Sequence, residues 1–425
     1  MRSWVGRSAI SRFVAVVLLC SLAACASPRT SAPSYIAPVS GPAIVVTPDH
    51  GASALPGGWL PCGFPTQNEG GDLASTTGAH YANCSVALNS TTGGGGGDLK
   101  SSAFHGLQPA DIVRAYNFPA SNAGMTVAIV DAFDDPRAEA DMGVYRAKFG
   151  LRPCTTANGC FRKVNQEGKP GPYPHESRAW GHEIALDVEM VSAVCPNCHI
   201  LLVEANSAAV DNLGAAVDEA VALGAHVVSN SYFAVEWRGE TAEDVHYNHP
   251  GVAITVSSGD ATVAYQGEGG GGDLVTRAAS GYPYHVGPYY PASSPYVTSV
   301  GGTELEQIGN VWIQDAWKYD GRGCSRYEPR PTFQPSLCPT RASVDLAVVG
   351  DPRTGVAIYA SQAGGWVVAA GTSVGAPVIA AAYALSGNPQ GPGFSYSHLS
   401  SFTDIKPAGF DRATGLGSPY GVGGL

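Results

Sequence analysis

The sequence contains little charge, and most of that charge is negative. Only 14% of its 425 residues are charged, and 24 Lys and Arg stand against 35 Asp and Glu, which gives a net charge of −11. The shortage of basic residues argues against a nucleic-acid-binding protein, whose domains are usually basic. Because 44% of the residues are hydrophobic, the low charge also argues against a largely disordered chain.

Other features are missing as well, and each absence excludes a class of protein. No long uncharged apolar run follows the N-terminus, which argues against a polytopic membrane protein. The 54 glycines have no three-residue period, which excludes collagen. No phosphate-binding glycine motif follows an expected strand, so we expect no nucleotide. The histidines show no metal-ligand spacing.

Residues 1–25 have the features of an export signal. Three arginines precede a short apolar stretch, residues 13–22, which is too short to span a bilayer comfortably. The stretch ends in Leu-Ala-Ala-Cys25, which resembles a bacterial lipoprotein box, where the cysteine becomes the lipidated first residue. We therefore expect an exported protein that is anchored by a lipid on Cys25, or freely secreted if cleavage follows Ala26 instead.

The cysteines agree with export, because eight of the ten lie beyond the signal and an even number in an oxidising compartment predicts disulfides. The close pair near residue 195 has the CxxC spacing of a redox pair or half a zinc site, but no second close Cys/His pair accompanies it. Pairing sequence neighbours gives four expected disulfides: Cys62–Cys84, Cys154–Cys160, Cys195–Cys198 and Cys324–Cys338.

The chain divides into two parts after the signal. Residues 26–103 are rich in Ser, Pro, Gly and Thr and are expected to form a tether or short propiece. In residues 104–425, strand-like apolar runs alternate with helical patterns, which predicts one large α/β domain with a parallel sheet flanked by helices on both faces. We expect strands at 126–130, 199–203, 227–228 and 252–256, and helices at 177–194, 211–223 (with Asp211 as N-cap) and 374–385.

Polar residues of catalytic type stand at the ends of these elements. Ser373 directly precedes the 374–385 helix, where backbone N–H groups can stabilise an oxyanion, although an isolated serine there is more often an N-cap. Glu183 and Asp187 are four apart on one helix, so they share a face, and burial would make them share a proton. The alternative for that pair is a solvated acidic face. Asp260 follows the strand at 252–256, either as a site residue or as a turn residue.

Taken together, these residues resemble the sedolisin family of serine-carboxyl peptidases over residues 106–419. Five motifs in the family's order carry the resemblance. It implies a subtilisin-like fold and endopeptidase activity at acidic pH. The motifs are Thr126-Val-Ala-Ile-Val-Asp131, Glu183-Ile-Ala-Leu-Asp187, Ser257-Ser-Gly-Asp260, Tyr290-Pro-Ala-Ser-Ser-Pro-Tyr-Val-Thr-Ser-Val-Gly-Gly-Thr303 and Gly371-Thr-Ser373.

The resemblance also implies roles for single residues. Ser373 would be the nucleophile, Glu183 its general base, and Asp187 the acid that orients Glu183. Asp260 would be a protonated donor in the oxyanion hole. Two further residues would support this network: Asp131 behind the acidic pair, and Tyr232 as a nearby aromatic.

A calcium site is implied near the C-terminus. Asp404, Ile405, Gly409 and Asp411 match the region in which the family binds calcium through carboxylates and backbone carbonyls. The loop between Ile405 and Gly409 is shorter than is usual in the family. The large folded prodomain of the family also has no room in residues 26–103.

Three alternatives remain open from the sequence. Asp131, His182 and Ser373 occur in the order of a subtilisin triad, although the usual sequence after the histidine is absent. The second alternative is an inactive lipoprotein that uses the fold as a binding module, and the third is an enzyme for another acyl substrate. The favoured reading predicts a peptide or protein substrate, no nucleic acid, membrane contact only through the lipid anchor, and a monomer.

Overall fold

The computed structural model describes residues 80–84, 86–89, 106–120, 124–260, 287–405 and 408–425, with the backbone of four short strands besides. These strands are β1 (Val45–Val46), β2 (Trp59–Pro61), β11 (Thr262–Val263) and β12 (Tyr284–His285). All lie within one compact unit, Ala37–Leu425. The predicted signal, with Cys25, and the predicted disulfide residue Cys62 lie outside the described residues.

The centre of the fold is a nine-stranded, mostly parallel sheet. Its order is β1-β15-β14-β10-β8-β5-β7-β6, and β18 also pairs with β14. The strands from β6 to β14 run parallel, while β14 and β15 form an antiparallel pair. Their bounds are β5 Thr126–Ala132, β6 Phe161–Asn165, β7 His199–Ala205, β8 Val227–Asn230, β10 Ala253–Ser257, β14 Thr298–Ile308, β15 Val311–Ala316 and β18 Leu346–Val349.

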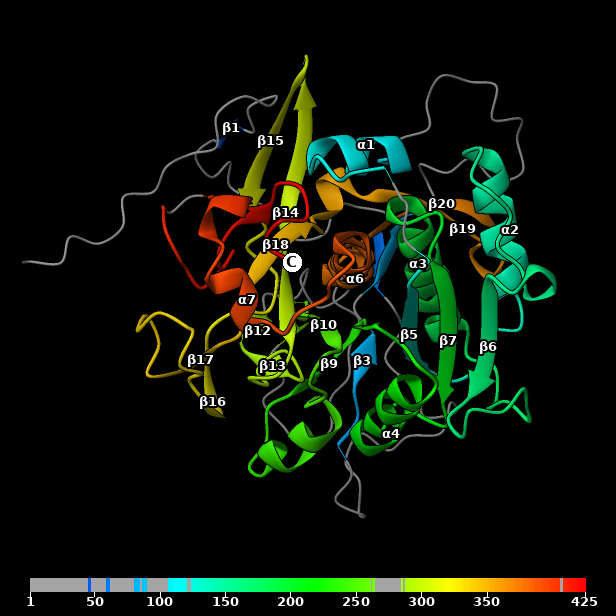
Figure 1. Ribbon diagram of the computed structural model, residues 1–425, viewed down its shortest axis with the longest axis horizontal. Coiled ribbons are helices and arrows are strands. Elements are labelled where there is room, and N and C mark those ends of the chain that lie inside the picture. The colour runs from blue at the N-terminus through cyan, green and yellow to red at the C-terminus, as the bar shows by residue number, and fades with distance from the viewer. Residues whose placement is uncertain are drawn as a thin grey trace, which may run out of the picture. The chain divides into compact units, whose positions relative to one another are not determined.

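Helices cover both faces of this sheet, as predicted (Figure 1). Along β5, Val127 and Ile129 enter one buried cluster, and Ala128 and Val130 enter another, because alternate strand residues point to opposite faces. The first cluster contains residues of α3 and α6, and the second contains residues of α4. The longer helices are α1 Pro109–Ala115, α2 Ala138–Lys148, α3 Arg178–Val194, α4 Val210–Ala222 and α6 Gly375–Ser386.

The helix ends follow local chemistry. Ser177 caps α3, because its Oγ accepts a hydrogen bond from the Trp180 N–H at 3.4 Å. The predicted cap of α4 is wrong by two residues: Ala209 is the N-cap, and Asp211 lies inside the first turn, where its charge still suits the helix dipole. A short 3-10 turn, Thr372–Val374 (η5), leads into α6.

Smaller sheets flank the central one. The bounds of their strands are β3 Asn83–Cys84, β4 Ala87–Asn89, β9 Tyr232–Val235, β13 Tyr289–Tyr290, β16 Cys324–Pro329, β17 Thr340–Ala342, β19 Val356–Ala360, β20 Gly365–Ala370, β21 Phe402–Thr403 and β22 Ser418–Pro419. Helix α7 (Gly393–Tyr396) and the 3-10 turns η1 Thr156–Asn158, η2 Glu240–His246, η3 Pro352–Thr354, η4 Ser361–Ala363 and η6 Leu399–Ser401 complete the set.

Early residues take part in two of these small sheets. Strand β3 pairs with β9, and β4 pairs with β20. Strands β3 and β4 therefore belong structurally with the later chain, while the domain boundary at 103/104 stays a prediction.

Three of the four predicted disulfides are confirmed. Cys154–Cys160, Cys195–Cys198 and Cys324–Cys338 are bonded, so the CxxC pair is a disulfide in this structure. The second of these spans the connection between the end of α3 and the start of β7. Cys84 is disulfide-bonded as well.

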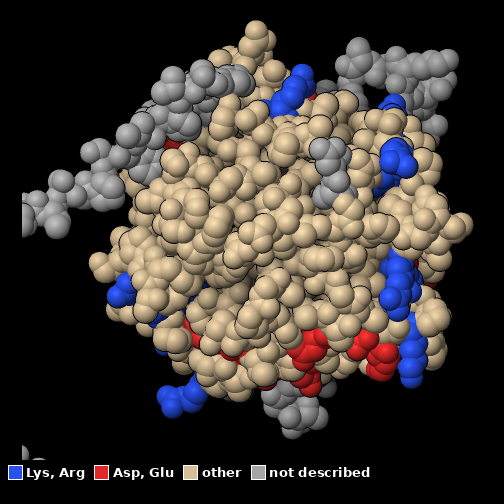
Figure 2. Space-filling view, in the orientation of Figure 1, with Lys and Arg blue, Asp and Glu red and all other residues tan. Residues whose placement is uncertain are grey.

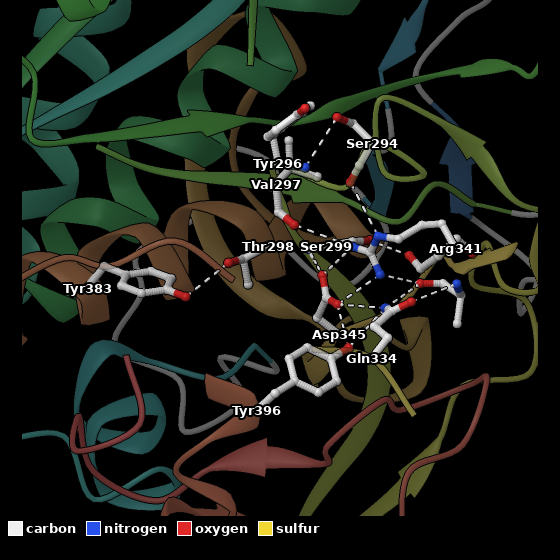
Figure 3. A network of polar contacts seen from close by, with 12 residues as sticks. Ser294, Tyr296, Val297, Thr298, Ser299, Gln334, Arg341, Asp345, Tyr383 and Tyr396 are labelled. Carbon is white, nitrogen blue, oxygen red and sulfur yellow. Dashed lines mark hydrogen bonds and ion pairs between the residues drawn. The ribbon is translucent and has the colours of Figure 1, made fainter. Parts of the chain in front are cut away.

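A buried ion pair joins β17, β14 and β18 (Figure 3). Arg341 and Asp345 form two contacts, at 2.8 and 2.5 Å, and neither side chain is more than 1% exposed. Asp345 also accepts hydrogen bonds from the Ser299 N–H and the Tyr396 hydroxyl. This network fixes the start of β14 against the segment that leads into β18.

The surface reflects the sparse charge of the sequence. In the face shown in Figure 2 most residues are uncharged, and Asp and Glu gather along the lower edge. Among the described residues, no helix is both long and apolar enough to cross a membrane.

Candidate active site

Ser373 lies in η5, at the turn between β20 and α6. It is fully buried, and its Oγ makes no hydrogen bond to the other described residues. A buried hydroxyl without a partner costs free energy, so its presence calls for an explanation beyond packing. The predicted nucleophile therefore has the exceptional environment expected of a functional group.

One residue connects Ser373 to the acidic pair on α3. The Ser231 Oγ lies 2.9 Å from Asp187 Oδ1 and 3.4 Å from the carbonyl oxygen of Ser373. Helix α3 packs against both η5 and α6. Asp187 and Glu183 are fully buried on this helix, so the solvated-face alternative for this pair is wrong.

Asp131, at the carboxyl end of β5, completes an acidic group with this pair. Both of its carboxylate oxygens are buried and make no hydrogen bond to a described residue. Burial, then the nearby charges of Asp187, Glu183 and Glu204, raise the pKa of Asp131. Burial raises the pKa of Asp187 as well. Because like charges this close repel one another in an apolar interior, the group must hold protons.

A cation stands at the far end of this acidic group. The Lys163 ammonium lies 2.9 Å from Glu204 and also pairs with Asp134. Burial raises the pKa of Glu204 to about 8 despite that contact.

Asp260 lies just after β10, where Gly259 has a φ of +93°. A Cβ on Gly259 would lie 2.5 Å from the Tyr289 ring, so this tight turn requires glycine. Asp260 Oδ1 accepts hydrogen bonds from both the N–H (2.9 Å) and the hydroxyl (2.8 Å) of Thr372, the neighbour of Ser373. Burial raises the pKa of Asp260 to about 7. The neutral acid therefore carries its proton on Oδ2, the oxygen that Thr372 leaves free.

Burial, followed by Tyr247 and the charge of Asp131, raises the pKa of the Tyr232 hydroxyl, and the supporting role of Tyr232 stays a prediction. That hydroxyl donates to Asn230 Oδ1 at 2.9 Å and lies 3.3 Å from the Tyr247 hydroxyl. The ring is fully buried against Trp180.

His182, the base of the alternative subtilisin triad, has different neighbours. Burial, and then the charge of Arg178, lower the pKa of its ring to about 4, and the ring bonds the backbone of Gln362. None of the acids around Asp131 is among the groups that shift it. These contacts do not favour His182 as the partner of Ser373.

The predicted calcium region shows two close carboxylates. Burial, followed by the charge of Asp411, raises the pKa of Asp404. However, Asp404 Oδ2 accepts the Gly409 N–H at 2.7 Å, and both oxygens of Asp411 accept hydrogen bonds from its own turn. Calcium prefers six to eight oxygen ligands, so backbone carbonyls such as those of Ile405 and Gly409 would have to join the two carboxylates. No group of three or more metal-binding side chains occurs in the described part. Calcium stays a prediction, and no chemical step below depends on it.

A second acidic group lies beneath β9 and β13, and we call it the carboxyl cluster: Glu236, Glu240, Asp244 and Glu328. Its members are at most 9% exposed, and η2 packs against β16 to bring them together. Burial and the other carboxyls raise the pKa of Glu240 to about 8 and that of Glu328 to about 9.

Three residues of the candidate site escaped sequence reasoning: Ser231, Thr372 and Asp320. Thr372 stood inside a quoted motif and Ser231 directly precedes Tyr232, but nothing in the sequence said which acid each would contact. Asp320, which faces Asp260 across an isolated antiparallel bridge, lies in a loop without periodic pattern.

Comparison with known proteins bears on this arrangement. No family model matches the chain. It is 25% identical over 373 residues to kumamolisin from Bacillus sp. (strain MN-32), a match that covers 76% of this chain and 64% of kumamolisin. The chain therefore spans just under two thirds of the length of that relative.

The solved structures agree on the fold. A structure of Pseudomonas sedolisin, a serine-carboxyl proteinase complexed with two molecules of pseudo-iodotyrostatin, matches with a TM-score of 0.59 and 22% identity, over 74% of this chain and 95% of that one. Fervidolysin from Fervidobacterium pennivorans is more distant, with a TM-score of 0.47 and 17% identity, and we draw no conclusion from that match. The chain is therefore similar in sequence to kumamolisin and similar in fold to Pseudomonas sedolisin, in agreement with the resemblance that its motifs indicated.

Proposed function

We propose that this chain is a serine-carboxyl endopeptidase that hydrolyses peptide bonds in acid. Ser373 is the nucleophile, Glu183 the general base, Asp187 the acid that orients it, and Asp260 the oxyanion donor. The observation behind the proposal is that hydrogen bonds link two protonatable acids to Ser373 or its neighbour. Ser231 contacts both Asp187 and the Ser373 carbonyl oxygen. Thr372, which precedes Ser373, donates two hydrogen bonds to Asp260.

The first step is attack of the Ser373 hydroxyl on the substrate carbonyl. Glu183 takes the hydroxyl proton as the new C–O bond forms, and the carbonyl oxygen becomes an oxyanion. The proton on Asp260 Oδ2 donates a hydrogen bond to this oxyanion. Glu183 then returns its proton to the leaving amine as the C–N bond breaks.

The second step is hydrolysis of the acyl-enzyme. Glu183 accepts a proton from water as the water attacks the ester carbonyl. Glu183 then gives this proton to the Ser373 oxygen as the C–O bond of the ester breaks. Asp187, which would share a proton with Glu183, and Asp131 both have a raised pKa, and the protons they hold keep the buried group from carrying several negative charges at once.

The pH dependence follows from Asp260. Its raised pKa, about 7, means that it is neutral and can donate in acid, and that it loses this ability as the pH rises through neutrality. Because the oxyanion donor Asp260 must hold its proton, its raised pKa supports activity in acid.

Exported location fits this function. The disulfides are typical of an oxidising compartment outside the cytoplasm. We propose that the mature chain acts there on peptides or unfolded proteins, as a lipoprotein anchored through Cys25 or in free form, and as a monomer.

The test is cleavage of a denatured protein from pH 2 to 9 by the mature chain, beside Ser373→Ala. Activity confined to acid and abolished in the variant is expected. A neutral optimum would point to His182 instead, and folded protein without activity at any pH would favour the binding-module alternative. Melting with and without a chelator tests calcium separately, since a bound ion adds stability that chelation removes.

A further inference from the structure

The acid opposite Asp260 has no role in the mechanism above. Asp320 faces Asp260 across the antiparallel bridge, and the Gly321 N–H donates to the Gly259 carbonyl oxygen at 2.5 Å. A Cβ on Gly321 would lie 2.1 Å from the Ser258 carbonyl oxygen, so only glycine lets the two loops approach this closely.

Residues that face each other across such a bridge carry their side chains on the same side, about 5 Å apart at Cβ. Two carboxylates in that position repel one another, and here Asp320 is fully buried and Asp260 is partly buried. One of the two must therefore keep its proton over a wide pH range.

A neighbouring cation decides which acid ionises first. Arg322 forms an ion pair with Asp320 and also bonds the Trp317 carbonyl oxygen, and the Gly302 N–H donates to Asp320 Oδ2 at 3.0 Å. Asp260 has no such cation among the groups that shift its pKa, and its hydrogen bonds come from the uncharged Thr372.

We propose that Asp320, held by Arg322, is a positioning residue that keeps the proton on Asp260, by placing the ionised member of the pair opposite the oxyanion donor. The proposal rests on the proposed function in one respect, the donor role of Asp260. Its physical content, the effect of one carboxyl on the proton of the other, does not depend on catalysis.

Burial raises the pKa of Asp320 to about 7, with a further contribution from the charge of Asp411, and Arg322 is the main group that lowers it. The phenol ring of Tyr289 packs where Gly259 and Gly321 meet. The charge of Asp320 is the one charge that contributes to the raised pKa of Asp260.

Two variants remove the ionised carboxylate opposite Asp260, and both should make Asp260 lose its proton at lower pH. Asp320→Asn keeps the acceptor for the Gly302 N–H, but it removes the negative charge and leaves Arg322 unpaired, so the neutral-side limb of kcat/KM should move to lower pH by at least about half a unit, which is about threefold in rate on that limb. Arg322→Gln removes the cation that keeps Asp320 ionised, so Asp320 then competes for the proton, and the limb should also move to lower pH. Asp211→Asn, an exposed acid-to-amide change on α4, is the matched control and should move nothing.

A second readout is independent of activity. In Ser373→Ala protein with ¹³C-labelled aspartate, the Asp260 carboxyl signal is assigned by its loss in Asp260→Asn, and its titration midpoint should shift with each variant in the same sense as the limb. Equal losses at every pH with an unchanged midpoint would show a merely structural role and overturn the proposal, as would a shift to higher pH in either variant. If the wild-type chain cleaves nothing, the proposed function fails, and the carboxyl titration still decides between these outcomes. If Asp320→Asn does not fold, Arg322→Gln decides alone.

Discussion

At the scale of single residues, the site separates its acids by their surroundings. Asp187 bonds a hydroxyl, Asp131 makes no hydrogen bond to a described residue, and Asp260 accepts two hydrogen bonds on one oxygen. The three aspartates therefore hold their protons differently, although the residue type is the same. The chemical role of each aspartate depends on its contacts and burial rather than on its residue type.

Removal of the base is the most direct residue-scale prediction. Glu183→Gln has nearly the same shape but cannot accept the Ser373 proton, so kcat should fall by about 10²–10⁴-fold at the optimum pH. Peptide hydrolysis with matched thermal melting measures this. Full activity in a folded variant would remove Glu183 from the mechanism.

Asp260 allows a prediction with a pH signature. Asp260→Ala deletes one oxyanion donor and should lower turnover by about 10²–10³-fold at acid pH. Asp260→Asn offers an amide donor that does not titrate. It should recover part of that loss and abolish the decline in activity around pH 7, because that decline reflects loss of the Asp260 proton. An unchanged decline in the amide variant would assign it to another group.

At the scale of elements, the sequence predicted the main strands and helices but not how their ends meet. The runs at 126–130 and 199–203 are apolar and bounded by turns, which is enough to identify β5 and β7. The bond from Ser231 to Asp187 and the bridge from Asp260 to Asp320 join residues 44 and 60 positions apart. No periodic pattern in a single sequence encodes such long-range pairs.

The ion pair between Arg341 and Asp345 allows an element-scale stability prediction. Asp345→Ala leaves a fully buried guanidinium without its counter-charge and removes the acceptor for Ser299 and Tyr396. We expect the free energy of unfolding to fall by about 3–5 kcal/mol. Urea unfolding of Ser373→Ala protein, with and without the change, measures this. A loss below 1 kcal/mol would mean that water replaces the contacts.

At the scale of the whole molecule, burial of many acids ties stability to pH. Carboxyls with a raised pKa in the fold bind protons that the unfolded chain releases at its ordinary pKa. Stability is therefore greatest below about pH 4 to 5 for these groups and falls as the pH rises through their folded values, about 8 for Glu240 and about 9 for Glu328. Between the unfolded and the folded pKa of a group, its proton lowers the free energy of unfolding by about 1.4 kcal/mol for each unit that the pH rises.

The carboxyl cluster makes this testable. Glu328→Gln removes one titrating group, so the melting temperature should fall less steeply between pH 5 and 8 than in the parent protein. Both proteins should carry Ser373→Ala to prevent self-cleavage. Exposed Asp211→Asn serves as the control, and parallel curves for all three proteins would contradict a role for the cluster.

The pairing of strands β3 and β4 with later strands determines what a maturation cut would release. Strand β4 lies between β2 and β20 within one sheet, and β3 pairs with β9, the strand that directly follows Ser231. A maturation cut in the glycine run at 93–97 would thus free the chain ends but leave the upstream piece hydrogen-bonded in place. The excised segment would remain as a non-covalent subunit of the mature protein, and denaturation would be needed to separate the two pieces.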